Sequence, residues 1–250
     1  LTAIIETDTD WSTTRFIIDD REVENNKLPC FLVRSKLQAF TLPIQKLKRD
    51  QKQLDFHPER ACYVKVTNSN EKKFIRLGLN QDKGSDQTDC FILEKDGSIT
   101  TPIDWNYEQI TEAIACPIED KTLSIRGGIF TTIANQAESV YNYYSRGIDI
   151  IRSNTVVDGI THYVIGEGKH GSPYRGFINA LDCANVTIQN SFFTGHKIYW
   201  TIGSAGLPVM MGSYDLHANS VVNFILRNCR MNHINDRTSV KSGRTSGCIE

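Results

Sequence analysis

The chain has 250 residues, of which 40% are hydrophobic, and its 28 basic residues nearly balance its 29 acidic ones. This balance leaves no global field that would mark the chain for nucleic acid or anionic membranes. No uninterrupted apolar stretch approaches the roughly 18–20 residues needed to cross a bilayer, so we expect no membrane span. The seven cysteines lack CxxC spacing, which argues against a zinc ribbon and against a complete disulfide framework.

Residues 1–57 are predicted to cap a stack of strands, because an open sheet end must be covered. The segment begins with Leu1 and shows no signal-peptide pattern, so the start looks processed or trimmed. Two strand-like runs, residues 15–20 and 31–33, are separated by a polar turn. Residues 34–52 carry six basic residues and one acid, which suits either a patch for an anionic polymer or, as we favour, a solvated linker.

Residues 58–118 are predicted to form a small antiparallel sheet and a linker, inserted before the main repeat. Three alternating runs, at residues 62–66, 73–77 and 90–93, are joined by polar loops. These loops contain oxygen-bearing side chains that calcium prefers, but their spacing does not match an EF-hand. The residues concerned are Asn80, Asp82, Asp86 and Asp89. We therefore predict no metal site in this segment.

Residues 119–250 are organised by a unit that occurs four times. Its copies are TLSIRG at 122–127, NTVVDG at 154–159, NVTIQN at 185–190 and NFILRN at 223–228, with closing residues 32, 31 and 38 positions apart. The alternation is typical of half-buried strands, and the closing Gly or Asn suits a corner with positive φ. A repeat of this length without helical periodicity predicts an all-β fold, a parallel β-helix, with a β-sandwich or jelly roll as the alternative.

The repeats also predict which residues stack between coils. His162 follows its closing glycine by three residues, where the other copies have Phe130, Phe193 and Met231. We therefore expect His162 to be a stacking residue of the interior. Residues 236–250 are polar and hold no further clear repeat, so we expect the β-helix to be incomplete at its C-terminal end.

Two glycine-rich excursions, residues 166–176 and 195–217, interrupt the repeats and hold most candidate site residues. Loops on a rigid scaffold often carry function, and in a solenoid they gather on one side. The candidate catalytic residues are His170, Tyr174, His196 and Tyr199. The candidate substrate-binding residues are Glu167, Arg175, Lys197, Trp200, Tyr214 and His217. For Tyr174 and Tyr199, packing over the coil is the alternative.

The repeats of N-x-T/V-I-x-N/G type behind a capping segment resemble right-handed parallel β-helix proteins of the pectate-lyase-like superfamily. The glycine-rich loops are similar to those of secreted β-helix proteins from Bacteroidales. The resemblance implies a secreted, cell-surface or periplasmic protein that acts on polysaccharide as a lyase or glycoside hydrolase. Non-catalytic glycan binding, as in an adhesin, and a tailspike-like assembly are the further alternatives.

A lyase is favoured over a hydrolase because the excursions hold few carboxylates beyond Glu167 and Asp215, but many cations, histidines and tyrosines. We expect β-elimination on an acidic, uronic-acid polysaccharide. His196 or His170 would be the base, and Tyr199 or Tyr174 the acid.

Arg175 and Lys197 would bind the uronate carboxylate in this hypothesis. The cofactor is left unidentified, and a divalent cation stays open as an alternative. A zinc site built from His170, His196 and His217 is conceivable across successive coils, but it rests on no recognised ligand motif. The Gly203–Gly206 stretch lacks the spacing of a serine nucleophile motif.

Overall fold

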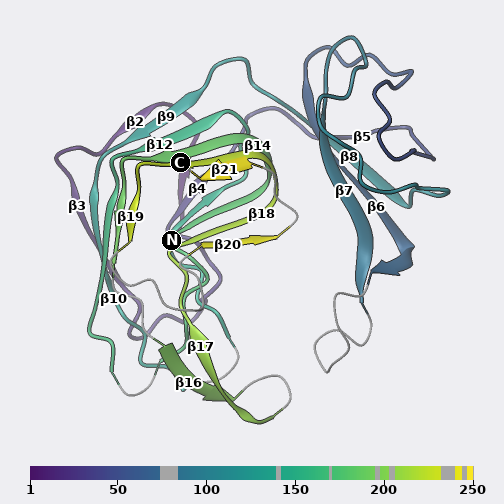
Figure 1. Ribbon diagram of the computed structural model, residues 1–250. Helices are drawn as coiled ribbons and strands as arrows, with labels where there is room; N and C mark the ends of the chain where they lie inside the picture. Colours follow the sequence, from purple (N-terminus) through teal and green to yellow (C-terminus); the bar gives the residue numbers. More distant parts are fainter. Residues whose placement is uncertain are drawn as a thin grey trace.

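The computed structural model describes residues 1–73, 84–138, 142–168, 171–194, 198–202, 206–231, 240–243 and 247–249. Over these ranges the chain forms strands that wind into stacked coils, with a smaller sheet beside them (Figure 1). Most coils have three sides, each formed by one strand, which we call face 1, face 2 and face 3. Along the chain, the strands follow one another in the repeating order face 2, face 3, face 1. In the described part of the chain, no helix is long and apolar enough to cross a membrane.

Face 2 contains the four sequence repeats. It consists of β2 (Thr9–Asp10), β9 (Leu123–Arg126), β12 (Thr155–Asp158), the second halves of β14 (Ile178–Gln189) and β18 (Leu216–Arg227), and β21 (Gly247–Ile249). Its strands are parallel, and Leu123, Thr155, Val186 and Phe224 pair in one line across it. This is the alignment that the repeats predict, so the all-β parallel β-helix is confirmed and the sandwich alternative is excluded.

Face 3 follows the corner that closes each repeat. It consists of β3 (Arg15–Asp19), β10 (Ile129–Ile133), β13 (Thr161–Ile165), β15 (Phe192–Phe193) and β19 (Arg230–Met231). Phe130, His162, Phe193 and Met231 pair in line along it. His162 is buried, and its ring stacks on that of Phe177 with centroids 3.8 Å apart. The prediction that His162 is a stacking residue is confirmed.

Face 1 completes each coil. It consists of β1 (Ala3–Ile5), β4 (Phe31–Val33), β11 (Ile148–Ile150), the first halves of β14 and β18, and β20 (Val240–Gly243). Strands β14 and β18 turn from face 1 to face 2 without a break. Positive φ at Asp182 and Asn185, and at Ser220 and Asn223, allows the backbone to bend at these corners.

The N-terminal residues belong to the coils, contrary to the cap expected from the sequence. β3 pairs in parallel with β10 and β4 with β11, so residues 3–33 build a coil rather than a separate cap. The apolar residues of these strands match the inward positions of the next coil, and Phe16 stacks on Phe130 at 4.6 Å. At the other end, β20 and β21 pair in parallel with β18, so residues 240–243 and 247–249 continue the stack of coils.

The insertion between β4 and β9 is an antiparallel sheet, as predicted, with larger bounds. Its strands are β5 (Phe40–Thr41), β6 (Cys62–Lys73), β7 (Ser85–Leu93) and β8 (Glu112–Pro117), in the order β5-β8-β6-β7. Leu42, Leu47 and Leu54 belong to its core, so the stretch after Val33 is part of the insertion rather than a linker or a cap. Leu47 lies between two lysines and Leu54 between Gln53 and Asp55, so neither belongs to an alternating strand pattern.

Candidate functional site

Both glycine-rich excursions leave the β-helix at the same corner, between face 3 and face 1. The first connects β13 to β14, and the second connects β15 to β18 through the antiparallel hairpin of β16 (Ile198–Ile202) and β17 (Pro208–Gly212) (Figure 1). The Tyr214 amide donates to the carbonyl of Tyr174 at 2.9 Å, which ties the two excursions together. We call this region the loop corner.

The structure places only some of the predicted site residues. His170, His196 and Lys197 lie outside the described residues. Tyr199 and Trp200 lie in β16, where their backbones pair with Met211 and Met210.

Glu167 follows β13 and is half-buried. The four others, Tyr174, Arg175, Tyr214 and His217, lie on adjacent coils at or next to the loop corner.

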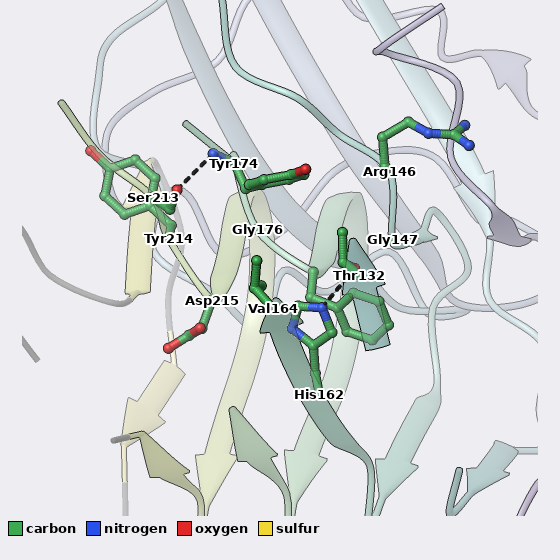
Figure 2. Close-up of a pocket in the computed structure, with 11 residues that line it drawn as sticks. Thr132, Arg146, Gly147, His162, Val164, Tyr174, Gly176, Ser213, Tyr214 and Asp215 are labelled. Atoms are coloured by element: carbon green, nitrogen blue, oxygen red, sulfur yellow. Dashed lines mark hydrogen bonds between the residues drawn. The ribbon is translucent and has the colours of Figure 1, made fainter. Parts of the chain in front are cut away.

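Tyr174 points into the molecule rather than toward the surface. Its hydroxyl accepts a hydrogen bond from the Asn135 amide at 2.9 Å. Its own amide donates to the Ser213 hydroxyl at 2.9 Å (Figure 2). Burial, and then the nearby Asp20 carboxylate, raise the pKa of Tyr174 well above its usual range. The geometry therefore supports the packing alternative for Tyr174 over the role of proton donor.

Beside Tyr174 lies a small internal cavity. It measures about 20 Å³ and is lined by His162, Arg146 and Asp215 among others (Figure 2). Such a space holds about one water molecule, which is too little for a sugar. The cavity belongs to the interior of the coil and does not form a substrate site.

The exposed side of the loop corner combines aromatic rings with cations. Tyr214 stacks on Tyr143 with ring centroids 5.7 Å apart, and both residues are half-buried. Arg175 is exposed next to them. Desolvation, and then the charge of Arg175, lower the pKa of Lys27, so the two cations lie within electrostatic range of each other.

A line of three polar side chains runs from strand to strand on the outer side of face 1. Asp149 in β11 pairs with Asn179 in β14, and Asn179 pairs with His217 in β18. Asn179 donates through Nδ2 to Oδ1 of Asp149 at 3.0 Å. Asn179 and His217 are buried although they alternate along their strands with residues of the interior core. We call these three residues the polar row.

Asp149 is a carboxyl with a pKa shifted toward neutral pH, a property common at functional sites. Burial raises its pKa to about 6, although the hydrogen bond from Asn179 and the charge of Arg175 act in the opposite direction. A carboxyl that titrates near neutral pH can take up or release a proton under physiological conditions. Arg175 is thus close enough to interact electrostatically with both Asp149 and Lys27.

Sequence reasoning missed Asp149 and Asn179. Each alternates with apolar residues in a strand and carries no motif, as in Ile148-Asp149-Ile150. One signal was available, because Asp149, Asn179 and His217 recur at steps of 30 and 38 residues, close to the period of the repeats. In the described residues, no group of three or more His, Cys, Asp or Glu side chains could hold a metal ion.

Comparison with known proteins gives matches to solved structures alone. No family model matches the chain, and no curated protein does. The tailspike protein gp49 from Pseudomonas phage LKA1 is 10% identical with a TM-score of 0.33, and the match covers 92% of this chain and 52% of that one. The gp54 tailspike of Acinetobacter baumannii bacteriophage AP22, solved in complex with A. baumannii capsular saccharide, is 8% identical with a TM-score of 0.29, covering 99% and 57%.

The chain therefore spans little more than half the length of either tailspike. The assignment of a parallel β-helix rests on the strand pairings of this chain itself.

Proposed function

We propose that this chain is a secreted or cell-surface polysaccharide-processing protein of the pectate-lyase-like kind. It binds an acidic glycan at the loop corner next to Asp149, the half-buried member of the polar row, and it cleaves the glycan by β-elimination. One observation carries the proposal. Asp149 is a carboxyl whose pKa burial raises to about 6, and it lies within electrostatic range of the Arg175 cation.

The cations account for binding of a uronate. The planar guanidinium of Arg175 can bind a carboxylate through two parallel hydrogen bonds, and Lys27 adds a second positive charge. Lys27 is held in place by a hydrogen bond from its ammonium group to the Tyr143 carbonyl. Neutralising the uronate makes the proton α to its carboxylate more acidic, which is the first requirement of an elimination.

Asp149 joins the candidate bases. It would take the α proton, the electron pair would form the new C=C bond, and the glycosidic C–O bond would break. The leaving oxygen then needs a proton, for which Tyr199 in β16 is the proposed donor. The roles predicted for His170, His196 and Lys197 remain predictions.

The activity test uses purified protein and a panel of uronic-acid polysaccharides, with absorbance of the unsaturated product as the readout. We expect Arg175→Gln to lower kcat/KM at least tenfold, about 1.4 kcal/mol of transition-state binding. If Asp149 is the base, the rate rises with pH to a plateau above pH 6, and Asp149→Asn removes both the rate and its pH dependence. Arg21→Gln, at an exposed Arg–Asp pair after β3, is the matched control.

A non-catalytic glycan-binding protein is the second candidate. It is favoured by the Tyr143–Tyr214 pair, since aromatic side chains bind sugars without any chemistry. Retained binding with no product on any polysaccharide would establish it. A tailspike-like assembly would in addition appear as a stable trimer in solution.

A glycoside hydrolase fits the described residues less well. It needs two carboxyls roughly 5–5.5 or 6.5–9.5 Å apart. The polar row supplies one, and Asp215 is buried at the internal cavity (Figure 2).

A further inference from the structure

A second hollow adjoins the polar row where the insertion leaves the β-helix. It has a volume of about 480 Å³, within the range of roughly 300–1,000 Å³ that is usual for ligand sites. We call it the junction groove, and the residues used below are Glu6, Arg34, Lys36, Leu37, Pro117 and Ile151. The groove is therefore formed jointly by the end of face 1 and by both arms of the insertion.

The junction groove continues the outer surface of face 1. Val33 pairs with Ile150, and the Ile151 amide donates to the Val33 carbonyl at 2.9 Å, so Arg34 and Ile151 are the next residues of the two adjacent chains. Ile151 lies two residues after Asp149, and a strand rises about 3.3 Å per residue, so roughly 7 Å separate their backbones. A ligand that extends along β11 from the polar row enters the groove directly.

The charge of the groove suits an anionic ligand. Arg34 Nε lies 2.8 Å from one oxygen of Glu6, and Lys36 Nζ lies 3.9 Å from the other. Two cations thus share one carboxylate, and both cations are half-exposed to solvent or more. Exposed ion pairs of this kind contribute little to stability, so a ligand carboxylate can replace Glu6 at small cost.

The backbone next to these cations is held in place by hydrogen bonds to Glu119. Glu119 accepts hydrogen bonds from the Ser35 hydroxyl at 2.7 Å and from the Lys36 amide at 3.3 Å. Its other oxygen binds Arg152 at 2.7 Å, and Arg152 is buried. The groove is therefore preorganised, which reduces the entropy lost when a ligand binds.

We infer that the junction groove is a second subsite, which binds a further carboxylated sugar of the same glycan chain. Arg34 and Lys36 bind its carboxylate in place of Glu6, and the apolar side chains of Leu37, Pro117 and Ile151 contact the sugar ring. This inference rests on the proposed function, because it assumes that the glycan also occupies the loop corner. It implies that affinity grows with chain length until one chain fills both subsites.

The test measures dissociation constants for size-fractionated oligogalacturonates and oligomannuronates, from dimers to long oligomers. We expect long oligomers to bind the unmodified protein at least tenfold more tightly than dimers. The double variant Arg34→Gln/Lys36→Gln should lose this gain while its affinity for dimers is unchanged. Arg21→Gln, the variant of an exposed Arg–Asp pair on another face, should behave like the unmodified protein.

A third variant should change the affinity for long oligomers in the opposite direction. Glu6→Gln removes the carboxylate that competes with the ligand for Arg34 and Lys36, so long oligomers should bind several-fold more tightly. A general loss of positive charge or of folding cannot produce this increase. Thermal unfolding of each variant confirms that it is folded.

The outcomes separate the two proposals. If the double variant binds long oligomers as tightly as the unmodified protein, the second subsite is refuted, whereas a loss of binding in Arg175→Gln would keep the proposed function. If Arg175→Gln is silent and the double variant is not, the loop-corner proposal fails and the groove is supported as a carboxylate site of its own. If no oligomer binds, both are overturned.

Discussion

Asp149 lies between two isoleucines that point into the coil, and the alternation of β11 directs its carboxyl to the outer side. There it is half-buried, next to Asn179 and within electrostatic range of Arg175. In the sequence Asp149 is one polar residue of an alternating strand and carries no motif. Its pKa is raised because partial burial removes water from the carboxyl.

The first prediction concerns this carboxyl and pH. Its pKa is about 6 in the folded protein against an ordinary 3.8, so the folded state holds the proton more tightly. Its contribution to stability is thus present at pH values below about 4 and is lost as the pH rises toward 6. Asp149→Asn should therefore raise the free energy of unfolding at neutral pH, by roughly 1–2 kcal/mol because the group is partly solvated.

Thermal or urea unfolding at acidic and at neutral pH measures this effect. The two proteins should be nearly equal in stability at the acidic pH. A variant that is less stable than the unmodified protein at neutral pH would contradict the burial of a charged carboxyl.

The second prediction concerns Tyr174. Tyr174→Phe removes the acceptor of the Asn135 amide, a buried group, so we expect the free energy of unfolding to fall by about 1–3 kcal/mol. Glycan affinity should not change, because the hydroxyl points into the coil. Denaturant unfolding and binding measured on the same samples check both statements, with Tyr163→Phe at an exposed site of face 3 as the control. A stable variant without activity would restore the catalytic role.

At the scale of the element, the corners of β14 and β18 decide how a coil can bend without interrupting its strand. Asn185 has φ of 56° and Asn223 of 57°. Their amides form a ladder along the stack, in which Asn185 donates to Asn154 at 2.8 Å and Asn223 donates to Asn185 at 2.9 Å. Asparagine serves both needs, because it tolerates positive φ and its amide can bind the next coil.

The third prediction separates these two contributions. Asn185→Gly keeps the backbone conformation but loses both ladder bonds, whereas Asn185→Ala also places a Cβ in the left-handed region, at a further cost of about 1–2 kcal/mol. The free energy of unfolding should therefore decrease in the order Asn, Gly, Ala. Chemical denaturation of the three proteins measures it, and an Ala variant as stable as the Gly variant would show that the corner is not strained.

At the scale of the whole molecule, the insertion is attached to the β-helix through a specific contact. The Tyr63 hydroxyl donates to the Ser220 carbonyl at 2.7 Å, and Lys65 pairs with Asp182 at 2.7 Å. Around them, Tyr63 and Ile92 pack against Ala184 and Val222. These contacts hold the insertion against the corner between faces 1 and 2, and the junction groove exists because the insertion is held there.

The fourth prediction tests this attachment. Tyr63→Phe leaves the Ser220 carbonyl without its donor in a buried contact, which should lower the free energy of unfolding by about 1–3 kcal/mol. Because the two units share the contact, we expect one transition to shift as a whole. Calorimetry shows this directly. A Tyr63→Phe protein in which the insertion melts separately, with an unchanged main transition, would mean that the β-helix does not depend on the contact.

The sequence by itself determined the repeat, its register and the interior stack. Leu123, Thr155, Val186 and Phe224 align in space as they align in the repeats, since a parallel stack places equivalent residues of successive coils side by side. The same periodicity assigned His162 to the interior, and the glycine-rich composition located both excursions. All of these are local or periodic properties of the chain.

Only the tertiary structure decided which residues of different coils, and of the insertion, come into contact. Residues 3–33 carry no copy of the repeat and still form a coil, because inward apolar side chains suffice for pairing. Asp149 gains its pKa from groups that cover it, and the junction groove joins Arg34 to Pro117 across an entire inserted sheet. Burial and long-range electrostatics depend on distances between segments far apart in the chain, and a single sequence does not contain those distances.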